Sequence, residues 1–477
     1  MIKSSTMRSL GALALIAGLA ACQPTPPEEP GRAEIEARLV PVVTIIGDDY
    51  SDYSLEERRE AYGVPSASVA VGRGGEASWA GAYGAADSPD TRFQAASLSK
   101  TVAAAGILAL AAERGVDIDA DITADLPMLD WADINRENRP VTLRGLLSHT
   151  AGATVGGFPG YPVDAEIPSN LEVIRGGAIT NTDPVVIEYD PEQPRRYAGG
   201  GYQIAQLWAE TVSGEPFPSL MRRLVLDPVG MSMSDFTQPP PGDVGPEGYA
   251  RAHESDGAPL EGGWHVYPEL AAAGLWTTAP DYLRFALALM AAEGGDETVG
   301  ISPDIAREMT TPVVQTFALG LGAEMRGEER RWRKGGSNRG FRSYVMMFPD
   351  RGDAIIVMTN GENGFPLLGD INRTANTVYG WPSSPLLTEE RFPLDAEALA
   401  VFAGGYAFPL SDDPVLQLVA GEGELSASIG GGAPFRLVPI SETLFIDPAD
   451  GQEVEFEIEG ETITARSQGY TFTRLAE

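Results

Sequence analysis

An alanine- and leucine-rich segment that opens on Ser97-Leu98-Ser99-Lys100 constrains this chain more than any other feature. It runs from Ser97 to about Arg114 and meets a helix stop at Gly115, so it predicts one long helix. A spacing of three residues at the start of a helix places the side chains of Ser97 and Lys100 on one face. A serine hydroxyl needs a nearby base to become nucleophilic, and a lysine amine with a lowered pKa can be that base. The segment therefore favours a nucleophilic serine at the start of a helix.

Lysine is rare in this chain, which makes its positions informative. Beyond residue 21 only Lys100 and Lys334 remain, against 30 arginines. Arginine stays protonated, whereas a lysine amine in a desolvated or cationic site can lose its proton. Lys334 opens the glycine-rich segment Lys334-Gly335-Gly336-Ser337-Asn338. We interpret the two lysines as parts of one active site.

The N-terminus has the pattern of an export signal. Lys3 and Arg8 give it positive charge, and the apolar run that follows is too short for a standard membrane span. The run ends in Leu19-Ala20-Ala21-Cys22, which resembles the lipobox of bacterial lipoproteins and implies cleavage before Cys22 and acylation of its thiol. We expect a signal peptide at 1–21, a lipid-anchored tether at 22–31, and a mature protein on the periplasmic face of a bacterial membrane, with the outer membrane favoured. An ordinary signal peptide that happens to contain a cysteine is the alternative.

The charge balance argues against several classes of partner. The chain has 68 acidic and 34 basic residues, and this formal net charge of −34 disfavours nucleic acid and electrostatic binding to anionic lipid. The three histidines are scattered singly, without the spacing of metal ligands, so neither a metal nor a cofactor is expected. His149 is interpreted as a structural hydrogen-bonding residue rather than a general base.

Strand and helix signals indicate a mixed first domain and a β-rich second one. Apolar strands at 342–348 and 354–359 flank Pro349-Asp350-Arg351-Gly352-Asp353, which predicts a hairpin. Past residue 393, short strands separated by glycine, aspartate and proline turns predict an antiparallel β-domain, such as a small barrel. We expect a first domain at 32–380, a linker at 381–393 and the β-domain at 394–477. Further elements are expected as strands at 66–71 and 77–83 and as helices at 204–213 and 281–292.

Five segments, in the same order, resemble those of the penicillin-recognising serine hydrolases, which include class C β-lactamases, D-Ala-D-Ala carboxypeptidases and related esterases. The segments are Phe93 to Thr101, Leu146 to Gly152, Tyr197 to Tyr202, Ala271 to Thr278 and Arg333 to Phe341. The resemblance covers about residues 50–380. It implies a β-lactamase/transpeptidase-like fold of the α/β (α+β) class, with an antiparallel sheet flanked by helices.

The resemblance also implies roles for individual residues. Ser97 attacks a carbonyl and becomes acylated, while Lys100 and Tyr197 handle its proton; which of these two is the base stays open. Lys334 supplies positive charge to the Tyr197 phenolate or to a substrate carboxylate, and with Gly335, Gly336 and Ser337 it forms the substrate-binding segment. Backbone N–H groups of Ser97 and Ser337 form an oxyanion hole.

Two departures from the family pattern bear on the substrate. Gly199 stands where the family has an asparagine whose amide contacts the acyl-amide of β-lactams and peptides, which favours ester hydrolysis. Gly335 stands in place of a threonine that binds substrate carboxylates, whereas the retained Lys334 favours an anionic substrate. We predict a serine hydrolase that cleaves a small ester or amide. The alternatives are a D-Ala-D-Ala carboxypeptidase or penicillin-binding protein acting on peptidoglycan, and a catalytically silent binding lipoprotein.

Overall fold

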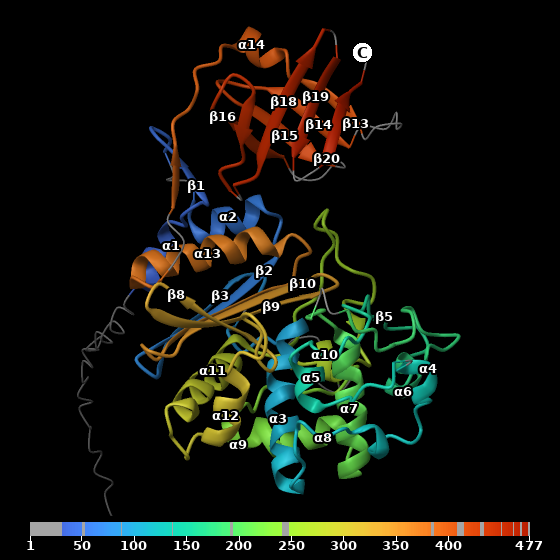
Figure 1. Cartoon of the computed structure of the whole chain (residues 1–477). Helices are drawn as coiled ribbons and strands as arrows, with labels where there is room; N and C mark the ends of the chain where they lie inside the picture. Colours follow the sequence, from blue (N-terminus) through green and yellow to red (C-terminus); the bar gives the residue numbers. More distant parts are fainter. Residues whose placement is uncertain are drawn as a thin grey trace, which may run out of the picture.

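The computed structural model describes residues 31–49, 53–86, 88–135, 137–190, 194–240, 248–382, 386–407, 415–429, 434–449, 451–460, 462–467 and 470–475. Cys22, the expected signal peptide and nearly all of the expected tether lie outside the described residues, as do residues 383–385 of the expected linker. Figure 1 shows a larger lobe of mixed helices and strands and a smaller β-rich lobe above it.

A six-stranded antiparallel sheet forms the centre of the larger lobe. The predicted hairpin is confirmed by strands β10 and β11, in which Arg342 pairs with Thr359 and Phe348 with Asp353. The two strands expected near the N-terminus are confirmed as β2 and β3. In spatial order the strands are β3 (Glu76–Gly84), β2 (Ser66–Arg73), β11 (Asp353–Thr359), β10 (Phe341–Phe348), β9 (Glu329–Asn338) and β8 (Gly322–Arg326).

Helices cover both faces of this sheet, which explains why β11 is buried along its whole length. On one face, Val69, Val71 and Ile355 pack with side chains from α13. On the opposite face, Ala70 and Ile356 belong to the larger core, which includes α11. The helices of the first face are α1 (Arg32–Ala37), α2 (Leu55–Ala61) and α13 (Gly364–Tyr379); α11 spans Ala279–Glu293.

The helical part of the larger lobe is built around α3 (Ser99–Arg114), which ends at Gly115 as predicted. The stretch Ala96–Arg114 is long and apolar enough to cross a membrane, but 78% of its most apolar window is buried inside the protein, as in a core helix. Around it lie α4 (Trp131–Ile134), α5 (Leu143–Leu147), α6 (Asn170–Arg175), α7 (Gly199–Ser213), α8 (Phe217–Met221), α9 (Asp227–Val229), α10 (Leu270–Ala273) and α12 (Pro303–Thr310). Short turns are η1 (Ala96–Leu98), η2 (Thr123–Asp125) and η3 (Arg222–Leu226).

Helix α7 starts five residues earlier than the sequence predicts. Glycine is a poor helix former, so the three glycines at 199–201 were not expected to be helical. A Cβ at Gly200 would lie 2.5 Å from the Thr154 carbonyl oxygen, so the close approach of that loop requires glycine there. Two short strand pairs brace this region, β4 (Phe93–Gln94) with β7 (Trp276–Thr277) and β5 (Tyr161–Pro162) with β6 (His265–Val266).

The smaller lobe is a closed eight-stranded antiparallel barrel, preceded by α14 (Ala396–Ala400). Its interior is filled by side chains, with Phe402, Phe445 and Phe456 in mutual ring contact. Along β18 buried and exposed residues alternate, as expected for strands that face a barrel interior. The strands are β13 (Gly404–Ala407), β14 (Leu416–Ala420), β15 (Leu425–Ile429), β16 (Phe435–Pro439), β17 (Leu444–Ile446), β18 (Glu453–Glu459), β19 (Thr462–Ser467) and β20 (Tyr470–Arg474).

An N-terminal strand joins the two lobes. Strand β1 (Val43–Ile45) pairs in parallel with β12 (Leu387–Glu389), and Figure 1 shows it between α1 and the barrel. Val43 and Ile45 are buried against Val438 and Ile446 of the barrel. A segment that precedes the larger lobe in the sequence therefore packs against the barrel, which is formed by the segment that follows that lobe.

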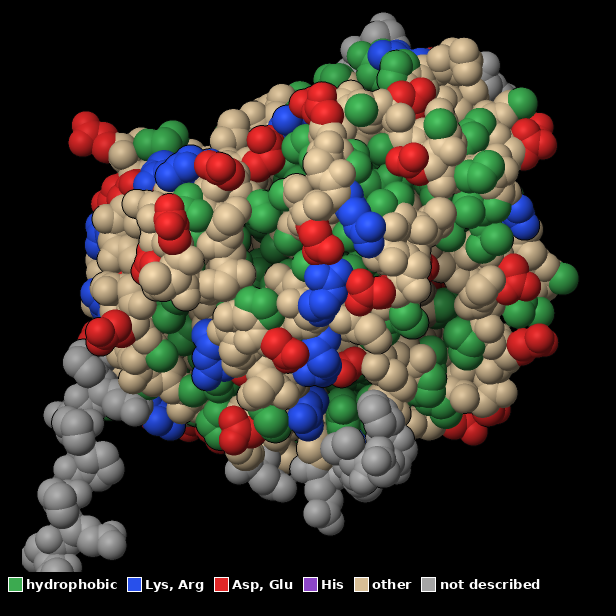
Figure 2. All heavy atoms as spheres, turned by 90° about the horizontal axis from the view of Figure 1, so that it is seen from below, with side chains coloured by type: hydrophobic (Ala, Val, Ile, Leu, Met, Phe, Trp, Pro, Cys, Tyr) green, Lys and Arg blue, Asp and Glu red, His purple; other side chains and the backbone are tan. Residues whose placement is uncertain are grey.

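On the face seen from below, acidic side chains are interspersed with basic ones. Figure 2 shows Lys or Arg and Asp or Glu side chains alternating across the middle of that face. Ion pairs of this kind include Arg223 with Glu113 and Glu215. Exposed pairs like these contribute little to stability, because water and salt screen their charges.

Candidate active site

Ser97 lies in the tight turn η1, directly before α3. Its neighbour Ala96 has a φ of +51°, a left-handed conformation that costs about 1–3 kcal/mol for a residue with a side chain. Two hydrogen bonds hold the turn: Ser343 Oγ donates to the Ala95 carbonyl at 2.8 Å, and the Ala95 N–H donates to the Leu275 carbonyl at 2.8 Å. The strained turn is thus fixed both from the sheet and from the segment after α10.

Lys100 lies one turn further along α3 and is only 2% exposed. Its Nζ donates to Ser97 Oγ at 3.2 Å and to the Ala272 carbonyl oxygen at 2.8 Å. Burial lowers the pKa of Lys100 to about 8; the charge of Lys334 adds to this shift, and the Tyr197 phenolate opposes it. The predicted Ser-x-x-Lys pair is therefore in hydrogen-bond contact, and the pKa of its amine is lowered to about 8.

Tyr197 and Lys334 come together from distant parts of the chain. The Lys334 Nζ on β9 donates to the Tyr197 hydroxyl at 3.3 Å and lies 4.7 Å from the ring centre, while Lys100 Nζ lies 5.3 Å from that centre. Burial opposes ionisation of Tyr197, but the two lysine charges and hydrogen bonds from Ser97 and Lys334 outweigh it and lower the pKa of Tyr197 to about 7. Lys100 and Tyr197 consequently titrate as a coupled pair.

His149 supports Tyr197 rather than Ser97. Its ring centre lies 4.4 Å from that of Tyr197, and its Nδ1 accepts a hydrogen bond from the Ala198 N–H at 3.2 Å. Burial and the charges of Lys334 and Lys100 hold the pKa of His149 well below its usual value, so the ring is neutral. The hydrogen bond expected of this residue in its turn is present.

The substrate-binding segment predicted at 334–337 runs along the end of β9, beside η1. A Cβ at Gly336 would lie 2.6 Å from the Ala95 carbonyl oxygen and 3.0 Å from the Ser97 backbone nitrogen. Only glycine allows β9 to come this close to the serine turn. At Gly335 a Cβ would lie 3.4 Å from the Tyr344 ring, an ordinary contact. Ser337 follows on the same strand, so its backbone lies one residue from the Gly336–Ser97 contact.

Asn338 ties β9 to the rest of the site, and the sequence analysis did not assign it a role. Its Nδ2 donates to Gln94 Oε1 at 2.7 Å and to the Ala273 carbonyl oxygen at 3.1 Å. Gln94 Nε2 in turn donates to the His265 carbonyl oxygen at 2.8 Å. This buried side-chain network links β9, β4 and α10. The only sequence signal for Asn338 is its place at the end of the Lys334 segment.

Glu269 is a second residue that sequence reasoning did not single out. It precedes α10, the helix whose Ala272 carbonyl binds Lys100, and it is fully buried. Neither carboxylate oxygen accepts a hydrogen bond from another described residue, and the amide of Gln203 on α7 is likewise buried without a partner among them. Burial raises the pKa of Glu269 to about 8. The residue is therefore a neutral acid at pH 7.

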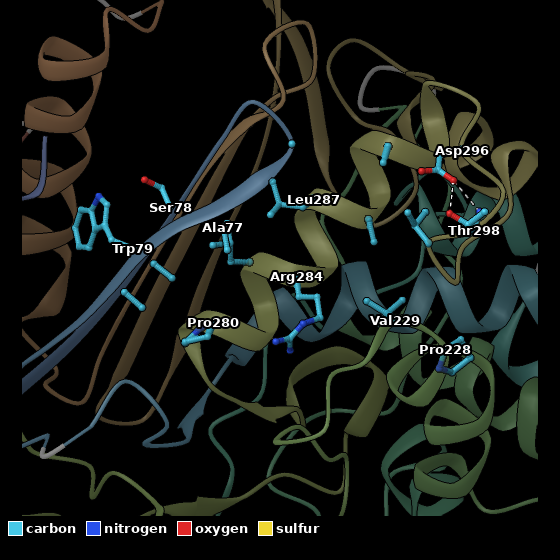
Figure 3. A pocket seen from close by; sticks show the side chains of 17 residues that line it. Ala77, Ser78, Trp79, Pro228, Val229, Pro280, Arg284, Leu287, Asp296 and Thr298 are labelled. Atoms are coloured by element: carbon cyan, nitrogen blue, oxygen red, sulfur yellow. Dashed lines mark hydrogen bonds between the residues drawn. The ribbon is translucent and has the colours of Figure 1, made fainter. Parts of the chain in front are cut away.

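The cavity shown in Figure 3 is not part of this site. It has a volume of about 620 Å³ and lies between β3 and α11, with Ala77, Leu287 and Arg284 among its lining residues. None of the predicted catalytic residues lines it. Within the described ranges, no group of three or more His, Cys, Asp or Glu side chains is placed to hold a metal ion.

The arrangement suits nucleophilic acyl transfer. It combines a hydroxyl on a strained turn, an amine and a phenol with pKa values near neutrality, and a second cation within 5 Å of the phenol ring. Groups whose pKa values fall near 7–8 are able both to accept and to return a proton at neutral pH. Six of the predicted site residues thus converge from η1, α3, the start of α7 and β9: Ser97, Lys100, Tyr197, Lys334, Gly336 and Ser337.

Comparisons with known proteins identify the family of the larger lobe. The family model described as Beta-lactamase matches residues 53–378. Among curated proteins, "Protein flp" of Staphylococcus aureus (strain NCTC 8325 / PS 47) is 23% identical over 234 residues, which is 46% of this chain and 43% of that protein. The match therefore spans less than half of the length of this curated relative.

Solved structures share the fold at low sequence identity. The octameric penicillin-binding protein homologue from Pyrococcus abyssi superimposes with a TM-score of 0.57 and 18% identity, covering 88% of this chain and 98% of that one. The D-amino acid amidase from Ochrobactrum anthropi SV3, complexed with L-phenylalanine amide, gives a TM-score of 0.52 and 22% identity, covering 69% and 96%.

Proposed function

This chain belongs to the Beta-lactamase family, and from that premise we propose that it is a serine hydrolase that cleaves an ester or an amide through an acyl-enzyme on Ser97. The observation that carries the proposal is the contact of Ser97 Oγ with Lys100 Nζ at 3.2 Å, next to a phenol with a pKa of about 7. A catalytically silent relative has no need to keep a lysine in this position, because burying an amine costs free energy even when the amine is hydrogen-bonded.

In the acylation step, Ser97 Oγ forms a bond to the substrate carbonyl carbon while its proton passes to the Lys100 amine or the Tyr197 phenolate. Both groups have pKa values near neutrality, so each can take that proton. The same group returns the proton to the leaving alkoxide or amine as the carbonyl–leaving-group bond breaks. In deacylation, Tyr197 takes a proton from water as the water oxygen bonds to the acyl carbon. The bond from that carbon to Ser97 Oγ then breaks, Tyr197 returns the proton to Ser97 Oγ, and the carboxylic acid leaves.

Two further interactions stabilise the charges that develop. The Lys334 Nζ donates to the Tyr197 hydroxyl, and this neighbouring cation lowers the pKa of Tyr197 and so favours the phenolate before proton transfer. The N–H groups of Ser97 and Ser337 are assigned to the oxyanion, and the contact of Gly336 with the Ser97 nitrogen supports this pairing, because it brings the two backbone segments together.

The substrate class favoured is an ester or simple amide. Gly199 lacks the amide group that would recognise a peptide beside the reacting carbonyl, and Gly335 lacks a hydroxyl for a carboxylate. A D-amino-acid peptide or amide, as for a D-Ala-D-Ala carboxypeptidase, is the second candidate. The cation Lys334, together with the fold shared with a penicillin-binding protein homologue and a D-amino acid amidase, favours it.

We place this activity on the periplasmic side of a bacterial membrane, held by a lipid on Cys22. The lipobox-like sequence before Cys22 and the proline-rich stretch after it support this placement. Expression of the full chain and of Cys22→Ser, followed by membrane fractionation, tests it. Release of only the variant into the soluble fraction agrees with lipid anchoring, and an equal distribution of both contradicts it.

A panel of three substrates tests the catalytic proposal: a short-chain p-nitrophenyl ester, a chromogenic cephalosporin and a D-Ala-D-Ala peptide. We expect turnover of the ester by the wild type and none by Ser97→Ala or Lys100→Arg. Ser426→Ala, on an exposed barrel position, is the matched control and should retain full activity. Fast ester turnover with negligible peptide release eliminates the carboxypeptidase alternative, and no reaction with any substrate supports the silent binding lipoprotein.

A further inference from the structure

A loop that contains Phe158 runs past the start of α7, beside Tyr197. The N–H groups of Gly199 and Gly200 donate to the carbonyls of Gly156 and Val155 at 3.3 and 3.0 Å. On its other side the loop is held at Pro159, whose carbonyl oxygen accepts from the Tyr267 hydroxyl at 3.3 Å. Phe158 lies between these two attachments, so its position is fixed from both sides.

The ring of Phe158 fills the space in front of Gly199. A Cβ built on Gly199 would lie 2.5 Å from Phe158 Cε2 and 3.3 Å from Cδ2 and Cζ. Gly199 is the first residue of α7 and is two residues after Tyr197, so the ring lies against the start of the helix that follows the phenol. Phe158 is partly buried and packs against the large core. A side chain at position 199 would therefore overlap the Phe158 ring while that ring stays in place.

We propose that Phe158 is a specificity-determining residue that gives the site an apolar wall on the α7 side. The inference rests on the proposed acylation of Ser97. A phenyl ring offers neither a donor nor an acceptor to an amide group, so an acyl chain with an amide beside the reacting carbonyl loses hydrogen bonds to water without replacement. An unsubstituted aliphatic or aromatic acyl chain has no hydrogen bonds to water to lose against this ring, and it buries apolar surface there. The preferred substrates are esters with an apolar acyl group.

Two p-nitrophenyl esters of matched length test this wall: the pentanoate, and the ester of N-acetylglycine, in which an amide replaces two methylenes. The measured quantity is the ratio of kcat/KM for the pentanoate to kcat/KM for the N-acetylglycine ester. Comparing this ratio between variants cancels the difference in chemical reactivity of the esters. Phe158→Ala is expected to lower the ratio, mainly by slowing the pentanoate.

The double variant Phe158→Ala/Gly199→Asn gives the sharper result. Removal of the ring makes room for an amide side chain at 199, so we expect the ratio to fall by about 10-fold or more, the value of one regained hydrogen bond to a buried amide. Gly199→Asn alone should lose activity with both esters, because its Cβ overlaps the ring. Phe365→Ala removes a phenylalanine that is 50% exposed on α13 and is expected to leave the ratio unchanged.

The outcomes separate this inference from the proposed function. Intact-mass spectra first establish whether each ester acylates Ser97. If adducts form on Ser97 but the kcat/KM ratio in Phe158→Ala and in the double variant stays within twofold of the wild-type ratio, the apolar wall is overturned and the proposed function is not. No adduct with either ester overturns the proposed function and the wall with it. If the double variant does not melt cooperatively, the kcat/KM ratio is measured in Phe158→Ala and Phe158→Leu instead. An unchanged ratio in both of these variants overturns the inference.

Discussion

Replacing Glu269 with glutamine removes a buried acid directly before α10, the helix whose Ala272 carbonyl binds Lys100, while keeping the shape of the side chain. Burial raises the pKa of Glu269 from 4.5 to about 8 in the folded chain, and the tyrosines that sense its charge are Tyr161 and Tyr267. Between pH 4.5 and 8 the unfolded chain has this carboxyl ionised, whereas the folded chain keeps it protonated. The unfolded state binds fewer protons in that window, so stability falls as pH rises.

The size of the effect follows from the width of the window. Each pH unit between the two pKa values lowers the free energy of unfolding by about 1.4 kcal/mol, so the loss from pH 5 to pH 8 is about 4 kcal/mol. Glutamine has no proton to lose. The stability of Glu269→Gln relative to wild type should therefore increase by about 4 kcal/mol over the same interval.

Urea denaturation at pH 5, 6, 7 and 8, followed by tryptophan fluorescence, measures this difference. The other titrating groups are common to both proteins and cancel in the comparison. Glu459→Gln, on an exposed position of the barrel, is the matched control and should follow the wild type at every pH. Parallel curves for wild type and Glu269→Gln would refute the reasoning, because they would mean that Glu269 is ionised in the folded chain.

Three further predictions concern the site and the link between the lobes. Lys334→Met removes a cation that lowers the pKa of Tyr197, so the acidic limb of the pH profile of kcat/KM should move to higher pH; an unmoved limb would show that Tyr197 does not set it. Gly336→Ala places a Cβ 2.6 Å from the Ala95 carbonyl oxygen and should abolish ester turnover in a chain that still melts cooperatively, whereas retained turnover contradicts the close packing of β9 on the serine turn. Val43→Asp puts a charge into the contact with the barrel, at a cost of about 2–4 kcal/mol, and should speed proteolysis between the lobes while ester turnover persists.

Local sequence rules were enough for the elements that contain a strong periodic or turn signal. The helix from Ser97 to Arg114 has few polar residues and a glycine stop, and the 342–359 hairpin has an unambiguous turn; both are present as α3 and β10–β11. The convergence of Ser97, Lys100, Tyr197 and Lys334 followed from the resemblance, since spacing alone relates only the first two.

Long-range packing accounts for what the sequence did not predict. The glycines at the start of α7 have low helix propensity, and the close approach of the loop at Thr154 and Phe158 explains why glycine stands at positions 199 and 200. Strand β1 is a three-residue apolar stretch whose partner, β12, follows more than 300 residues later, so no local signal announces it. Nothing in the local sequence distinguishes Glu269 from an exposed glutamate, and only the fold shows that it is completely buried.

The central claim is that a substrate acyl group becomes bonded to Ser97 Oγ. Intact-mass spectrometry of the protein quenched during turnover of p-nitrophenyl pentanoate, followed by peptide mapping, measures this directly. The account predicts a mass increase of one pentanoyl group located on Ser97, and no increase in Ser97→Ala. Turnover by Ser97→Ala at the wild-type rate, or an adduct that maps to another residue, would contradict it.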